Sequence, residues 1–234
     1  MNDGTGADGY SGTYFKLMDD INYTYNGNNE NNFTAIGNFS YYFKGHFDGN
    51  NHTVSGIRIY KYGSENSDWG QGLFGCIGEG GEVKNLTLND AYIAGHNQTG
   101  GIVGRFNGAA ITNCNVTSSV IIRSVQAYSV TGHGGIVGLM LSGTVSHCTS
   151  AATLTNENGG TCENYGGIAG EILNAGCVLS DNLAIGVVVP ASYGRTHGAI
   201  AGSVANGSTL THNYYANCTV AGDTDAIGCN NFDV

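Results

Sequence analysis

Basic residues and prolines are scarce in this chain, and long apolar runs are missing. Only eight of the 234 residues are Lys or Arg, the formal net charge is −10, and Pro190 is the single proline. Eight cations spread along the chain cannot form a continuous positive surface that would bind phosphate groups. We therefore expect no binding to nucleic acid or to anionic membrane surfaces. No apolar run approaches the roughly 18 residues of a membrane-spanning helix, so we also expect no membrane insertion.

The cysteine pattern excludes two further classes. The seven cysteines are an odd number, and no two of them form a Cys-x-x-Cys pair. A zinc knuckle or a complete disulfide framework is therefore not expected, and at least one thiol is left over. Nothing in the sequence calls for a cofactor. The first residues lack the basic and apolar regions of a signal peptide, so an exported protein would carry its signal outside this stretch.

Glycine, in contrast, is abundant and recurs in blocks. A glycine-flanked apolar pair follows Gly72, Gly101, Gly135 and Gly167, and Ala199 begins a variant of the same block, at intervals of 29, 34, 32 and 32 residues. A period in this range indicates a stacked repeat. Each block is followed by a short alternating run typical of a strand, and this much glycine would destabilise helical repeats. The sequence therefore predicts an all-β stack of coils.

We expect one continuous domain with three parts. Residues 1–12 form a flexible leader, residues 13–69 form N-terminal capping coils or a hairpin, and residues 70–234 form stacked β-coils, about five of them between Gly70 and Val220. One coil cannot bury its own apolar face, whereas a stack of coils makes a continuous core. The predicted interior ladder is Leu73, Ile102, Ile136, Ile168 and Ile200. The flanking glycines are expected to supply positive φ at the corners.

The cap is predicted from aromatic residues, most of which lie in the first 70 positions. The stretch from Phe43 to Tyr60 reads as a hairpin with its turn at Asp48-Gly49-Asn50.

Two cysteines occupy equivalent positions in successive coils. Cys114 and Cys148 align with Leu86 one coil earlier and with Asn182 and Asn213 later. Because a free cysteine behaves as a small apolar residue, we expect buried thiols in an interior ladder, with a disulfide between the two coils as the alternative.

A second aligned file contains polar residues: Asn85, Asn113, His147, Asp181 and His212. With neighbours about 4.8 Å apart, His147, Asp181 and His212 are candidate ligands for a divalent metal ion. The alternative is that Asn, Asp and His stand there because they tolerate the backbone conformation of a coil corner.

Candidate ligand-binding residues are the aromatic side chains Tyr41, Tyr42, Tyr60, Tyr62 and Trp69. Exposed Tyr and Trp rings suit sugar rings or protein partners. Along one strand, Arg58, Tyr60 and Tyr62 share a face while Ile57, Ile59 and Lys61 share the other, so one of these sets should face outward. The alternative is that the rings are buried in the cap.

The motifs together resemble a known family. "TYFKLMDDINY", "FKGHFDGNNHTVSGIRI", "GLFGCIGEGGEVKNLTL", the Gly-Gly-Ile-Val-Gly blocks and "HNYYANCTV" are similar to the GLUG-repeat region of bacterial cell-surface proteins. Such regions also lie beside IgA-specific metallopeptidases. The resemblance implies a right-handed parallel β-solenoid, exported as a module of a longer polypeptide, and it implies no single activity.

Catalysis is not expected. The chain has no His-Glu-x-x-His motif, and no two acids of the repeats share a motif as a glycosidase would require. We therefore expect a non-catalytic adhesin or spacer at the bacterial cell surface, with glycans or host and bacterial surface proteins as partners. The alternatives are a β-helical lyase or glycosidase and an accessory domain of a secreted metallopeptidase.

Overall fold

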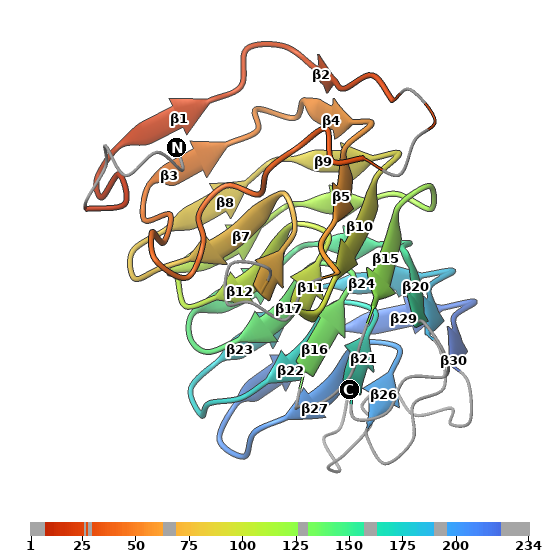
Figure 1. Ribbon diagram of the computed structural model, residues 1–234. Helices are drawn as coiled ribbons and strands as arrows, with labels where there is room; N and C mark the ends of the chain where they lie inside the picture. The colour runs from red at the N-terminus through yellow and green to blue at the C-terminus, as the bar shows by residue number, and fades with distance from the viewer. Residues whose placement is uncertain are drawn as a thin grey trace.

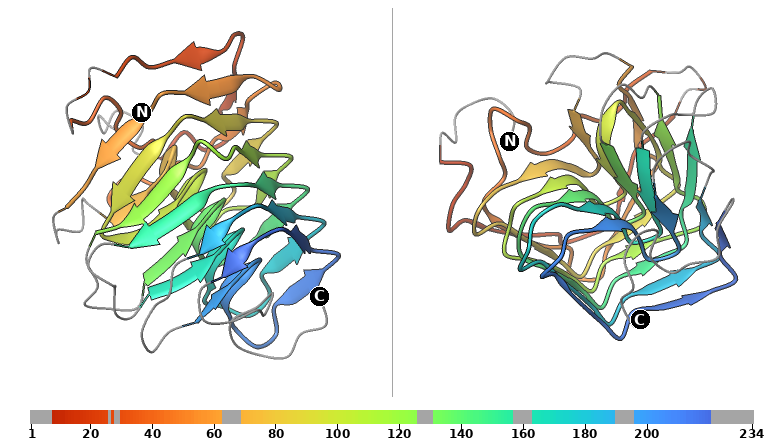
Figure 2. Two further views of the ribbon diagram at one scale, coloured as in Figure 1. Left: turned by 90° about the vertical axis from the view of Figure 1, so that its right-hand side faces the viewer. Right: turned by 90° about the horizontal axis from the view of Figure 1, so that it is seen from below.

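The chain forms a parallel β-solenoid. The computed structural model describes residues 8–25, 27, 30–62, 69–125, 131–156, 163–189 and 196–220, which contain thirty short strands and no helix. Among these residues, strands pair in parallel with their counterparts in the neighbouring coils, and five sheets result. Figure 1 shows the coils stacked along the molecule, and Figure 2 shows the stack from the side and from below. The all-β solenoid predicted from the repeat is confirmed.

Each coil contributes one strand to each sheet in turn. The first sheet contains β1 (Tyr14–Lys16), β3 (His46–Asp48), β8 (Glu82–Lys84), β13 (Ala110–Thr112), β18 (Thr144–Ser146), β23 (Val178–Ser180) and β28 (Thr209–Thr211). The second contains β2 (Ile21–Asn22), β4 (Thr53–Ser55), β9 (Thr87–Asn89), β14 (Asn115–Val116), β19 (Thr149–Ser150), β24 (Leu183–Ile185) and β29 (Tyr214–Ala216). The third contains β5 (Arg58–Tyr60), β10 (Tyr92–Gly95), β15 (Ile121–Ser124), β20 (Thr153–Asn156), β25 (Val188–Val189) and β30 (Thr219–Val220).

The fourth and fifth sheets complete the coil. The fourth contains β6 (Trp69–Gln71), β11 (Asn97–Gly100), β16 (Thr131–Gly134), β21 (Glu163–Gly166) and β26 (His197–Gly198). The fifth contains β7 (Phe74–Ile77), β12 (Val103–Phe106), β17 (Val137–Met140), β22 (Ala169–Ile172) and β27 (Ala201–Val204). Strands β3 to β27 thus form five complete coils, with β1 and β2 before them and β28 to β30 after them.

The predicted hairpin between Phe43 and Tyr60 is wrong. Strand β3 pairs in parallel with β1 and β8, and β4 pairs in parallel with β2 and β9, so the two strands belong to different sheets. The chain does turn at these residues, but the turn is a corner of the coil, where Asn50 and Asn51 have φ of 53° and 63°. Turn chemistry is the same for a hairpin and for a solenoid corner, so the local sequence could not separate the two.

Aromatic rings close the N-terminal end of the core, as predicted. The ring of Phe43 lies 5.8 Å from that of Phe15 and 5.1 Å from that of Phe74, and Phe47 lies 5.2 Å from Phe74. Of the predicted leader, residues 1–7 lie outside the described part of the chain.

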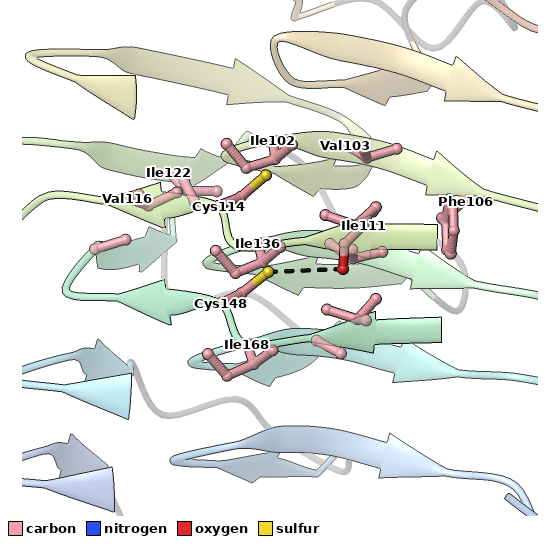
Figure 3. Packing of buried hydrophobic residues seen from close by; sticks show 14 of the residues in the cluster. Ile102, Val103, Phe106, Ile111, Cys114, Val116, Ile122, Ile136, Cys148 and Ile168 are labelled. Atoms are coloured by element: carbon pink, nitrogen blue, oxygen red, sulfur yellow. Dashed lines mark hydrogen bonds between the residues drawn. The ribbon is translucent and has the colours of Figure 1, made fainter. Parts of the chain in front are cut away.

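The predicted interior ladder is confirmed, since Leu73, Ile102, Ile136, Ile168 and Ile200 are all buried. Figure 3 shows three of these isoleucines one above another beside Cys114 and Cys148. Both cysteines are buried free thiols, so the alternative of a disulfide is wrong. Cys162 and Cys229 lie outside the described residues.

The repeated glycines serve a purpose other than the predicted one. The glycines of the blocks at 100–104, 134–138 and 166–170 are not among those with positive φ. A Cβ on Gly138 would lie 2.6 Å from the backbone of Gln98, Gly104 and Thr99, and one on Gly134 would lie 2.0 Å from the carbonyl oxygen of Val137. The fourth and fifth sheets therefore pack backbone against backbone, and only glycine fits between them.

Candidate ligand-binding groove

A hollow of about 370 Å³ lies on the outer face of the third sheet, across β5, β10 and β15. Parallel register places Arg58 beside Tyr92, and Tyr60 beside Ala94, which in turn lies beside Arg123. Alternation along each strand turns Ile59, Ile93 and Ile122 into the core, where all three are buried. The lining is rich in tyrosine and arginine: Tyr25, Tyr60, Tyr62, Tyr92, Arg58 and Arg123.

The tyrosines form a stack along this face. The rings of Tyr60 and Tyr92 lie 5.1 Å apart at an interplanar angle of 30°, and those of Tyr60 and Tyr62 lie 6.3 Å apart at 19°. Tyr62 is 47% exposed and Tyr25 is 40% exposed. Tyr62, at one end of the stack, therefore presents apolar ring surface to solvent beside its phenolic hydroxyl group.

Both arginines are held in place by their neighbours. Arg58 Nη2 donates to Asp90 Oδ1 at 2.8 Å, Nη1 donates to the carbonyl oxygen of Ile57 at 3.0 Å, and the guanidinium lies 4.7 Å from the ring centre of Tyr25. Arg123 Nη1 donates to Tyr92 Oη at 3.1 Å. These contacts orient the two guanidinium groups, which lowers the entropy lost when a ligand binds them.

Tyr60 keeps its proton over the whole physiological range. Burial, followed by a hydrogen bond with Tyr25, raises the pKa of Tyr60 to about 12. Its hydroxyl group is therefore a hydrogen-bonding group at neutral pH and is poorly suited to be a general base.

The five aromatic residues proposed from the sequence separate into two groups. Tyr60 and Tyr62 line the groove, so the outward set is Arg58, Tyr60 and Tyr62, and burial of Tyr62 in the cap is excluded by its exposure. Trp69 instead packs against Phe39, with 5.6 Å between the ring centres, and Tyr42 also contacts Phe39 at 6.3 Å. Tyr41 is 44% exposed but does not line the groove.

The polar file occupies the corner between the first and second sheets. His147, Asp181 and His212 have φ of 55°, 58° and 52°, and the two asparagines before them have the same conformation. His212 Nδ1 lies 3.5 Å from Asp181 Oδ1, with both side chains well exposed. Within the part of the chain that the structure describes, no three His, Cys, Asp or Glu side chains gather closely enough to hold a metal ion. The left-handed corner accounts for the residue types in this file.

Sequence reasoning missed Tyr25, Tyr92 and Arg123. Aligning the glycine blocks identified the residues of the core. The groove is instead formed by strands of the third sheet, at residues 58–60, 92–95 and 121–124. Aligning those runs would have placed Tyr92 one coil after Arg58 and Tyr60, and Arg123 two coils after them. Tyr25 lies in the incomplete N-terminal coil, after β2 and outside the aligned glycine blocks.

Comparisons with known proteins extend this description. The chain matches no family model. A stretch of 96 residues, 41% of the chain, is 34% identical to halomucin of Haloquadratum walsbyi and spans about 1% of that protein's length. A crystal structure of a Bacteroides ovatus protein, assigned as an immunoglobulin A1 protease, aligns over 88% of this chain and 69% of its own, with 18% identity and a TM-score of 0.48. No helix in the described residues is long and apolar enough to cross a membrane. This chain is therefore a β-solenoid with a local likeness to a small part of a much longer protein.

Proposed function

We propose that this chain is a GLUG-type module of a longer, exported surface protein, and that it binds extracellular glycans without catalysing a reaction. The observation that carries the proposal is the stack of Tyr60, Tyr62 and Tyr92 on the outer face of the third sheet. Tyrosine rings with adjacent hydroxyl and guanidinium donors suit sugars, because sugars present both apolar C–H faces and polar hydroxyl edges.

Two observations support display on a surface protein. Stacked coils form an extended, regular body that can present one face along its length. The local similarity to halomucin spans about 1% of that protein, which agrees with a repeat used within a far longer polypeptide.

The composition of the groove supports binding over catalysis. Among the lining residues that the structure describes, Asp90 is the one carboxylate, and it is paired with Arg58 at 2.8 Å. Glycosidases need two carboxylates that face each other across the bond that is cleaved. The raised pKa of Tyr60 likewise removes its hydroxyl as a base at neutral pH.

A glycan array with three forms of the protein tests this proposal. We expect the parent protein to bind a subset of glycans and Tyr62→Ala to lose at least tenfold in affinity, because this substitution removes the most exposed ring of the stack. Tyr214→Ala is the matched control, since Tyr214 is 63% exposed on the second sheet, outside the groove. It should bind like the parent.

Two results would overturn the proposal. The first is an absence of glycan binding by a folded parent protein. The second is turnover of a polysaccharide or peptide in a broad substrate screen that Asp90→Asn abolishes, because that would identify the groove as an active site.

A further inference from the structure

A second hollow, of about 180 Å³, lies on the outer face of the first sheet, across β1, β3 and β8. Alternation turns Phe47 and Val83 into the core, where both are buried, so the residues on either side of them face outward. Parallel register arranges the outward side chains in two rows, Tyr14, His46 and Glu82 in one and Lys16, Asp48 and Lys84 in the other. The rows lie about 7 Å apart, two residues along each strand, and form the walls of the hollow.

The first row holds an exposed aromatic ring in a fixed position. The ring of Tyr14 stacks on the imidazole of His46, with 4.4 Å between the ring centres and 15° between the planes, and Tyr14 is still 79% exposed. His46 Nδ1 donates to the carboxylate of Glu82 at 2.9 Å, which fixes the imidazole against which Tyr14 lies. Because the ring is held in place before a ligand binds, little conformational entropy is lost on binding.

The two walls offer both donors and acceptors to a ligand. On the second wall, Lys84 Nζ lies 3.9 Å from Asp48 Oδ2. Among the described residues, no hydrogen bond or ion pair engages Lys16 Nζ on this wall or Glu82 Oε1 on the other. A hydroxyl group both donates and accepts, so hydroxyl groups on one ligand can bond to the ammonium group and to the carboxylate.

We infer that this hollow binds a single uncharged sugar residue, with its ring against Tyr14 and its hydroxyl groups bonded to Lys16 and Glu82. The inference rests on the proposed function and adds a second glycan site to the groove on the third sheet. The hollow is smaller than the roughly 300–1,000 Å³ of sites for drug-sized ligands, so it fits one ring rather than a chain. Carboxylates and ammonium groups face it together, so a charged sugar would be attracted by one group and repelled by the next.

Nuclear magnetic resonance titration of the isotope-labelled protein tests this site. The probes are the methyl glycosides of glucose, galactose, mannose and N-acetylglucosamine. We expect at least one of them to shift the backbone amides of β1 and β3, and Tyr14→Ala to weaken that binding at least tenfold, because it removes the exposed ring. Tyr214→Ala is the control, since Tyr214 is 63% exposed and lines neither this hollow nor the groove. It should bind like the parent protein.

A substitution at Lys16 tests the polar wall. Lys16→Met keeps the length of the side chain and removes its ammonium donor, so we expect it to weaken binding at least fivefold. Lys44→Met is the matched control, because Lys44 does not line the hollow. Circular dichroism and melting temperatures establish that each variant is folded. Binding by folded Lys16→Met that equals that of the parent protein would overturn the inference.

The possible failures are distinguishable. If the amides of the third sheet shift and those of the first sheet do not, the inference is wrong and the proposed function stands. The inference is also wrong if methyl glucuronide binds the hollow at least tenfold more tightly than methyl glucoside, because that would identify a site for a charged sugar. If no methyl glycoside and no glycan of the array binds the folded parent protein, the inference and the proposed function fail together.

Discussion

At the scale of single residues, the fourth sheet contains an unusual buried histidine. His133 is fully buried between Thr99 and Tyr165 in the register of β11, β16 and β21, and its ring stacks on Tyr165 at 5.2 Å. Among the described residues, neither ring nitrogen has a hydrogen-bond partner. Burial, with a smaller contribution from the charge of His96, lowers the pKa of His133 from 6.5 to about 3. The folded protein therefore holds this imidazole neutral.

This residue predicts acid sensitivity. Below pH 6.5 the unfolded chain binds a proton at His133 and the folded chain does not, so stability falls as the pH drops toward 3. We expect His133→Phe, which keeps an aromatic ring beside Tyr165, to remove about 3 kcal/mol of the loss between pH 7 and pH 4. Urea unfolding of both proteins at several pH values measures the difference. Parallel pH profiles would contradict the assignment.

At the scale of the element, one interior position changes chemistry along the stack. Leu86, Cys114 and Cys148 are followed by the buried asparagines Asn182 and Asn213. Asn182 Oδ1 accepts from the amide of Cys148 at 2.9 Å, and Asn182 Nδ2 donates to the carbonyl of Val145 at 3.0 Å and to Asn213 Oδ1 at 2.9 Å. The thiol of Cys148 makes the weaker equivalent contact to the carbonyl of Ile111 at 3.8 Å (Figure 3). The asparagines thus bond successive coils together.

A double-mutant cycle measures this coupling. Asn182→Leu puts at this position the residue type found at Leu86. It removes the acceptor of the Cys148 amide and the side-chain donor to the carbonyl of Val145. Asn213 Oδ1 loses one of its two donors and keeps the backbone amide of residue 182. We expect a loss of about 3 kcal/mol, because buried unpaired polar groups cost about 1–3 kcal/mol each. Adding Asn213→Leu should cost at least about 1 kcal/mol less than it does alone, since one of its partners is already gone. Strict additivity in urea unfolding would show that the two amides are independent.

At the scale of the whole molecule, each coil contacts mainly the coils before and after it. Every sheet follows the same order of coils, and among the described residues each strand pairs only with strands of neighbouring coils. Stability is therefore expected to be a sum of coil terms and interface terms, and damage in one coil should affect its neighbours first.

Native-state hydrogen exchange on two matched variants tests this expectation. Ile136→Ala and Ile200→Ala remove the same atoms from the same ladder, each at a cost of about 2–5 kcal/mol. Ile200 lies in the last complete coil, so its loss should lower protection in β23 to β29 and leave β8 to β12 protected. Ile136 lies in a central coil, and its loss should lower protection on both sides. A uniform loss of protection in both variants would favour a single cooperative unit.

The sequence alone determined the features that depend on period and alternation. The spacing of the glycine blocks predicted the ladder of Leu73 and the four isoleucines, and alternation separated Ile57 and Ile59 from Arg58 and Tyr60. The aligned positions of Cys114 and Cys148 predicted buried thiols for the same reason. These features are local, because burial on one face imposes a two-residue period on each strand and a coil-length period on the chain.

Only the tertiary structure decided what depends on register between coils and on packing between sheets. The local sequence of Asp48 to Asn51 suits a hairpin and a solenoid corner equally, and the parallel partners β8 and β9 select the corner. The same holds for Gly138, whose small size is required by a sheet that belongs to another part of the coil. The groove joins Tyr60, Tyr92 and Arg123 from three coils of unequal length. These three side chains are neighbours because the length of each coil sets the register between successive strands of the third sheet. The local sequence around each residue does not contain that length.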